Sequence, residues 1–181
     1  VPAAPAAPVA APEKQPKYGG ILVAYRSWDL AGMDPMYAGG QDTLPLVNMY
    51  NGLLRYDFVD TGKVIPDLAE RWEVSPDGLT YTFYLRKDVK WQDGKPFGAW
   101  DVQFTYDRIL DKAQLAQSGI WGKLMFELAN SWKTIDDYTF QVTLKRPIIY
   151  FIPFLGNTSS RIGAKHMFDK EARTVVPKAG S

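Results

Sequence analysis

The chain has 181 residues, 46% of them hydrophobic and 14% aromatic, which is enough to bury the core of one domain of ordinary size. Lys and Arg together number 21 and Asp and Glu 20, so the chain lacks the basic excess that a general nucleic-acid binder needs. The absence of cysteine excludes a disulfide framework, a thiolate metal site and a thiol nucleophile.

The first part of the chain combines a proline-rich stretch with a strand, a long loop and a helix. Residues 1–17 are rich in Ala and Pro, which predicts an extended linker, or alternatively an arm that docks on a partner. The apolar run at residues 20–25 predicts a buried strand. The loop after it, RSWDLAGMDPMYAGGQD, is long, and long irregular loops in compact domains are often functional. A helix is expected at residues 43–51 and a strand at 53–57.

The middle of the chain has the alternating pattern of antiparallel β-structure. Residues 71–75 and 80–85 alternate, and the SPDG sequence between them is a type I turn signal, so they predict a hairpin with an aromatic and a polar face. A second pair of strands is expected at residues 127–135 and 138–144, joined by a turn. The side chains expected on the buried face are Tyr81, Phe83, Leu85, Phe140, Val142 and Leu144.

The stretch KWQDGKPFGAWDVQFTYDRI changes from turn to helix halfway. Residues 93–96, DGKP, are turn chemistry, and the spacing after them predicts a helix at about 99–112. Asp101 falls in its first turn, where the helix dipole favours an anion. Trp91 and Phe97 are expected to pack in the core. The buried helix face should consist of Val102, Thr105, Tyr106, Ile109 and Leu110.

These motifs follow one another in a fixed order. GLLRYD precedes VIPDLAERWEVSPDGLTYTFYLRKDVKWQDGKPFGAWDVQFTYDRI, and IDDYTFQVTLKRPIIYFIPFL comes later. The set resembles the amino-terminal part of the solute-binding proteins of ABC importers for oligopeptides, dipeptides and nickel, over roughly residues 18–166. One departure is Gly98, where the family often has Thr or Ser; glycine still serves as a helix N-cap, with less help from a side chain.

The resemblance implies an α+β fold, namely an α/β lobe fragment with a mixed sheet. It corresponds to lobe I of a periplasmic-binding-protein-like fold with a β-rich extra subdomain, and the second lobe is missing. We expect residues 1–17 to be the arm and 18–43 the first strand and cleft loop of lobe I. Residues 44–150 would form the antiparallel β-rich subdomain, and 151–181 a truncated return segment into lobe I.

The resemblance also implies a function. It predicts the substrate-binding component of an ABC import system, which captures a small solute, with a peptide as the leading candidate, between two lobes and delivers it to a membrane permease. The expected partners are that solute, the ABC permease and the carboxy-terminal remainder of the same protein, without nucleic acid. The expected location is periplasmic or lipid-anchored outside a bacterial cytoplasm, with the signal removed.

The ligand site implied by the resemblance lies on the cleft face of lobe I. Carried onto this chain, it falls on residues 25–28, 37–41 and the region near Asn157. Aromatic rings there offer flat apolar faces, glycines let the backbone approach a ligand, and amides donate and accept hydrogen bonds. Core packing is the alternative for Trp28. The candidate ligand-binding residues are Tyr25, Trp28, Tyr37, Gly39, Gly40, Gln41 and Asn157.

Catalytic and metal chemistry have little support in the sequence. His166 is the only histidine, and a surface position is expected for it. Asp136 and Asp137 suit a hairpin turn better than an acid–base pair across a cleft. The sequence has no GxSxG, Walker or GxGxxG motif, so we expect neither an enzyme nor a cofactor. The alternative function is a stand-alone β-rich interaction module that binds a ligand on its aromatic face.

Overall fold

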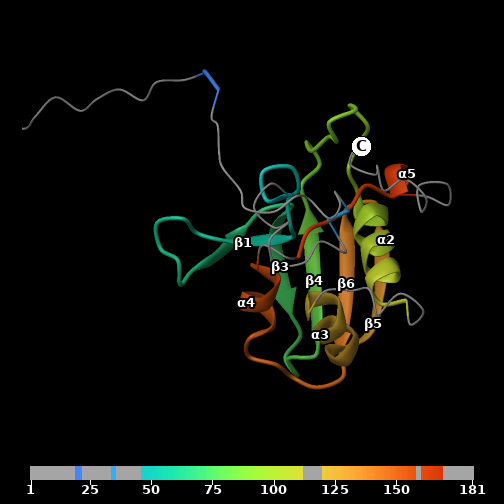
Figure 1. The fold of residues 1–181 in the computed structure, drawn as a ribbon. Coiled ribbons are helices and arrows are strands. Elements are labelled where there is room, and N and C mark those ends of the chain that lie inside the picture. The colour runs from blue at the N-terminus through green and yellow to red at the C-terminus, as the bar shows by residue number, and fades with distance from the viewer. Residues whose placement is uncertain (1–18, 22–33, 36–45, 112–119, 158–159, 169–181) are drawn as a thin grey trace, which may run out of the picture.

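The computed structural model describes residues 19–21, 34–35, 46–111, 120–157 and 160–168. At its centre is a four-stranded antiparallel sheet with the strand order β3-β4-β6-β5, beside a two-stranded sheet of β1 and β2 (Figure 1). The strands are β1 (Leu54–Tyr56), β2 (Val64–Pro66), β3 (Ala69–Val74), β4 (Thr80–Leu85), β5 (Ala129–Asp136) and β6 (Thr139–Leu144). The helices with described bounds are α2 (Ala99–Ile109), α3 (Ile120–Leu128), α4 (Phe151–Leu155) and α5 (Lys165–Phe168).

The two hairpins of the larger sheet form as their turn sequences predict. The Gly78 N–H donates to the Ser75 carbonyl at 2.8 Å, and Gly78 has a φ of 70°, which suits glycine. At the other hairpin the Tyr138 N–H donates to the Asp136 carboxylate at 2.8 Å. Cross-strand pairing places Phe83 opposite Phe140. All pairing among the described strands is antiparallel, so these residues do not form the expected mixed sheet.

The predicted buried face of the sheet is confirmed. Its six side chains are each at most 6% exposed, and the alternate positions of β4 and β6 are half-buried. The Phe140 ring lies 4.9 Å from that of Tyr106 on α2, and the Tyr81 ring lies 4.6 Å from that of Phe151 on α4. Because helices cover these rings, the aromatic face is core, and the idea that it is an open ligand-binding surface is wrong.

Helix α2 packs against β5 and β6. It begins at Ala99, with Gly98 as its N-cap, as expected. All five residues of its predicted apolar face are at most 5% exposed. A Cβ at position 98 would lie 2.4 Å from the Trp100 indole, so Ser or Thr would fit there only if that ring moved. The cap is supplied instead by Asp101, whose Oδ2 accepts the Gly98 N–H at 3.2 Å.

The Asp101 carboxylate joins the start of α2 and the WQDGKPF turn to the distant return segment. It is fully buried, and besides the Gly98 N–H it accepts the Trp91 indole N–H at 3.1 Å on Oδ2 and the Lys165 N–H at 2.8 Å on Oδ1. The nearby Thr105 hydroxyl accepts the Gly163 N–H at 3.0 Å. The WQDGKPF turn and residues 160–168 of the return segment are therefore both held on α2. The packing of Phe97, 1% exposed, and of the partly buried Trp91 in this region is also confirmed.

Several predicted boundaries need correction. The strand expected from residue 127 starts at Ala129, because Met125 and Leu128 lie three residues apart on the buried side of α3 and keep that segment helical. Of the helix expected at 43–51, Leu46 is helical and residues 47–49 form a turn after it, in which the Leu46 carbonyl accepts the N–H groups of Met49 and Tyr50. Of the strand expected at 20–25, only the first two residues are described, and they are not in a strand.

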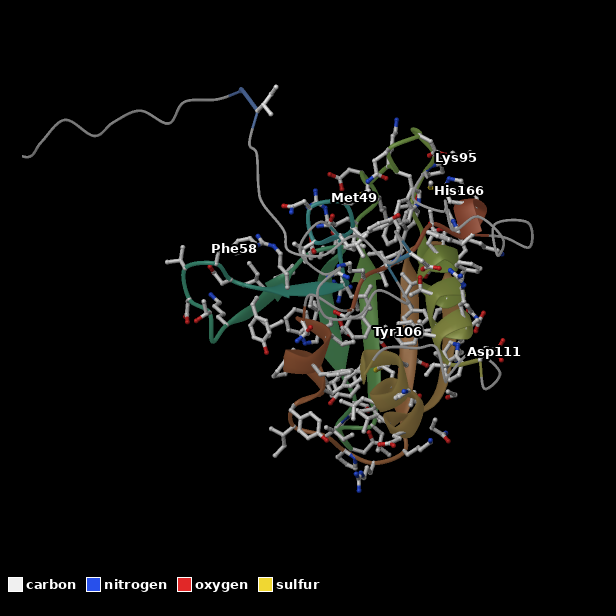
Figure 2. All side chains as sticks on the ribbon, viewed as in Figure 1. Met49, Phe58, Lys95, Tyr106, Asp111 and His166 are labelled. Carbon is white, nitrogen blue, oxygen red and sulfur yellow. The ribbon has the colours of Figure 1, made fainter. Side chains whose placement is uncertain are left out.

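Phe140→Ala should lower the free energy of unfolding by ~3–5 kcal/mol, because it leaves a cavity in the centre of the core. Phe58→Ala is the matched control: Phe58 lies between β1 and β2, 86% exposed, and points away from the core (Figure 2). We expect it to change stability by less than about 0.5 kcal/mol. Urea unfolding followed by tryptophan fluorescence measures both. Equal effects of the two substitutions would contradict the assignment of the core.

Asp101→Asn should lower the free energy of unfolding by ~1–3 kcal/mol, because the amide NH₂ cannot accept the hydrogen bonds that one carboxylate oxygen now accepts. Asp88→Asn is the control, because Asp88 is exposed and pairs only with a neighbouring arginine on the surface. We expect no measurable change there. If Asp101→Asn unfolds at the same urea concentration as the wild type, the hydrogen bonds to the Asp101 carboxylate are not what holds the return segment.

Candidate ligand-binding site

Of the seven predicted ligand-binding residues, the structure describes Asn157. It is exposed and follows α4, in a turn where its backbone carbonyl accepts both the N–H of Ser160 at 3.0 Å and the Ser160 hydroxyl at 2.6 Å. The Asn157 backbone carbonyl is thus tied to Ser160 by two hydrogen bonds. The other six predicted residues, in the segments 25–28 and 37–41, lie outside the described residues.

The part of the return segment that follows Asn157 is paired with the chain just before β1. Gly52 and Arg161 form an antiparallel bridge, and the Ile162 N–H donates to the Asn51 carbonyl at 2.9 Å. A Cβ on Gly52 would lie 2.7 Å from the Ser160 carbonyl oxygen, so the two backbones approach as closely as only glycine allows. Arg161 is 3% exposed, and burial lowers the pKa of its guanidinium.

The predicted cleft loop is represented by Asp34 and Pro35, and both are packed against the fold. The Asp34 carboxylate forms an ion pair with Arg108 of α2, with Oδ2 and Nη2 2.7 Å apart, and Pro35 is buried. Asp34 also affects Tyr50, the residue before the paired stretch: burial and the negative charge of Asp34 both raise the pKa of the Tyr50 phenol. The return segment therefore contacts residues 51–52, and Asp34 lies near enough to Tyr50 for its charge to act on the phenol.

A small pocket opens beside this stretch, with a volume of about 60 Å³. Its walls come from residues 49–51 and from the WQDGKPF turn, which are linked by the Gln92 amide donating to the Met49 carbonyl at 2.9 Å. Apolar ligand pockets are usually several hundred Å³ in volume, so this one is too small for a peptide. Within the described part of the chain, this pocket is therefore not a complete ligand site.

His166 is exposed, as expected, and its Nε2 lies 2.7 Å from Asp93 in the turn after β4. Partial burial raises the pKa of Asp93, but hydrogen bonds from the Lys95 N–H and from His166 outweigh it and hold that pKa below its usual value. Lys95 and His166 lie at the same end of the molecule (Figure 2). Among the described residues, no three His, Cys, Asp or Glu side chains gather where they could hold a metal ion.

Two charged residues near the predicted site were not found from the sequence. Arg108 occupies a polar position in the last turn of α2, where a cation is expected for the helix dipole alone. Arg161 stands in a short irregular stretch without a pattern. In the structure, their burial distinguishes them from surface charges, together with the ion pair of Arg108 with Asp34 and the pairing of Arg161 with Gly52. In the described residues, no helix is long and apolar enough to cross a membrane.

Comparison with known proteins gives one consistent result. The model of the bacterial extracellular solute-binding proteins, family 5, middle region, matches residues 63–177. The dipeptide-binding protein of Escherichia coli K12 is 37% identical over 145 residues, which cover 73% of this chain and 27% of that protein. The chain therefore spans under a third of the length of such relatives.

Solved structures of similar fold agree with this. The periplasmic binding protein DppA of Helicobacter pylori, in complex with the peptide STSA, has a TM-score of 0.66 and 34% identity, covering 78% of this chain and 30% of that one. NikA of Brucella suis, in complex with Fe(III)-EDTA, has a TM-score of 0.67 and 30% identity, covering 80% of this chain and 28% of that one.

The expected fold class is confirmed: the chain is a mixed α/β fragment of a periplasmic-binding-protein fold, about a third of the neighbours' length. The family model covers more than half of the chain, and the relatives are substrate-binding proteins for peptides. The resemblance seen in the sequence is confirmed with it. The chain belongs to the bacterial extracellular solute-binding proteins of family 5.

Proposed function

We propose that the whole protein is the substrate-binding component of an ABC importer and that its solute is a short peptide. The observation that carries this proposal is the 37% identity over 145 residues to a dipeptide-binding protein. The likeness to DppA of Helicobacter pylori in its complex with a tetrapeptide supports the same ligand class. Delivery of the peptide to a membrane permease completes the proposal.

The proposed mechanism is closure of two lobes over the peptide. A hinge motion of this kind is driven by contacts that the ligand makes better in the closed state than in the open state. It works best when each lobe moves as a unit. The hydrogen bonds of Asp101 and the pairing of Gly52 with Arg161 support that behaviour for this chain, because they tie its return segment to the rest of the lobe.

In this proposal, lobe I provides its first strand and cleft loop, residues 18–43, and the return segment, residues 151–181, while residues 44–150 form the β-rich extra subdomain. The ion pair of Asp34 with Arg108, whose guanidinium carbon also lies 5.2 Å from the centre of the Phe168 ring, supports a rim shared by the loop and the return segment. The remainder of the protein would supply the facing lobe. The proposed ligand contacts are Tyr25, Trp28, Tyr37, Gly39, Gly40, Gln41 and Asn157.

A chelated metal is the second candidate ligand. It is favoured by the likeness to NikA of Brucella suis in its complex with Fe(III)-EDTA, at 30% identity. With one histidine in the chain, such a metal would arrive with its own chelator rather than be held by imidazoles. A native mass spectrum of the full-length protein, purified without added ligand, separates the candidates by the mass of what co-purifies.

Gln41→Ala in the full-length protein should weaken peptide binding by ~1–3 kcal/mol, the scale of an unpaired buried polar group. Trp28→Ala should also weaken it, through loss of an apolar contact face. Isothermal titration calorimetry with a panel of dipeptides and the tetrapeptide STSA measures these changes. Gln141→Ala is the matched control, because the Gln141 amide on β6 donates to the Thr82 hydroxyl on β4 and is not a proposed contact. Unchanged affinity in both site variants, with folding intact, would contradict the proposed site.

The proposal also includes an extracytoplasmic location, periplasmic or lipid-anchored after removal of a signal. Fractionation of cells that express the native gene should therefore recover the protein outside the cytoplasm, in the periplasmic or the membrane fraction. A protein confined to the cytosol could not collect solutes for an importer, so that result would overturn the proposal.

A further inference from the structure

The ion pair between Arg108 and Asp34 is well shielded from solvent. The Arg108 side chain is 10% exposed and that of Asp34 24%, with 2.7 Å between Nη2 and Oδ2. The surface pair of Arg86 and Asp88 is 50% and 72% exposed. Shielding weakens the competition from water and salt, so the Arg108 pair holds its geometry far more strictly than a surface pair does.

Arg108 also contacts the return segment. Its guanidinium carbon lies 5.2 Å from the centre of the Phe168 ring on α5, within the range of a cation–π contact. One side chain on α2 thus touches Asp34 on one side and the end of the described return segment on the other. Burial and the negative charge of Asp34 raise the pKa of the Tyr50 phenol, so Tyr50 also lies near this pair.

We propose that Arg108 is a positioning residue for ligand binding: it fixes Asp34, three residues before Tyr37, relative to α2 and the return segment. The inference rests on the proposed function, because the chain continues from Asp34 to the proposed contacts Tyr37 to Gln41. Arg108 itself does not touch the ligand. It acts by holding Asp34, from which the chain continues to the proposed contacts, in one place before the ligand binds.

The chemistry of the pair determines which substitutions are informative. Methionine keeps the length and apolar stem of arginine but removes the charge, so it leaves Asp34 shielded and uncompensated. Lysine keeps the charge without the planar fork and should restore part of the contact. Asp34→Asn removes the charge from the loop while α2 and Arg108 stay intact, which gives a second route to the same broken pair.

The experiment uses the full-length protein and the peptide from the dipeptide and STSA panel that the wild type binds most tightly. Dissociation constants are measured by calorimetry, and unfolding midpoints without ligand are measured beside them. We expect Arg108→Met to weaken binding by at least ~10-fold, and Arg108→Lys to recover most of that loss. Combining Arg108→Met with Asp34→Asn should cost little more than either alone, because both break one interaction.

Arg86→Met is the matched control, since it removes the same charge from an exposed pair, and its affinity should stay within about twofold of the wild type. If Arg108→Met fails to fold, Asp34→Asn alone decides, and it should weaken binding likewise. Wild-type affinity in Asp34→Asn or in a folded Arg108→Met, or losses that multiply in the double variant, would overturn the inference. A wild type that binds none of the peptides would instead overturn the proposed function, and this inference with it.

Discussion

The arrangement of the whole lobe depends on one buried carboxylate. Asp101 accepts N–H groups from the helix start, from the WQDGKPF turn and from α5, and a buried charge without these partners would be costly. The three segments must therefore be in place together. Once they are, α2 covers the sheet and the return segment is led back to Gly52, whose missing side chain allows the close pairing.

This constraint connects the fold to the proposed function. A two-lobed binding protein needs lobes that keep their shape while the hinge between them moves. The junction at Asp101 and the pair of Arg108 and Asp34 tie the same helix to segments from both ends of the chain. Helix α2 is thus the common support of the loop and the return segment, both of which the family resemblance assigns to the cleft. The large aromatic core serves that support and not the ligand.

Local patterns predicted the elements but not the contacts that position the site. The alternation of β4 and β6 and the helical spacing of α2 are visible because burial repeats with the period of each element. The roles of Asp101 and Arg108 could not be predicted in this way, since they depend on which distant segment arrives beside them. Asp101 was predicted only as a partner of the helix dipole, and Arg108 was given no role. For the candidate site, the resemblance supplied all seven residues, and the described structure locates Asn157 among them.

The central claim is that this lobe forms one side of a peptide-binding cleft. A crystal structure of the full-length protein with its peptide bound tests it most directly. The account predicts a peptide enclosed between this lobe and a second one, in contact with residues 37–41 and with the turn at Asn157, while the Asp34–Arg108 pair stays closed. A peptide bound to another surface of this lobe, or one that leaves residues 25–41 and Asn157 untouched, would contradict it.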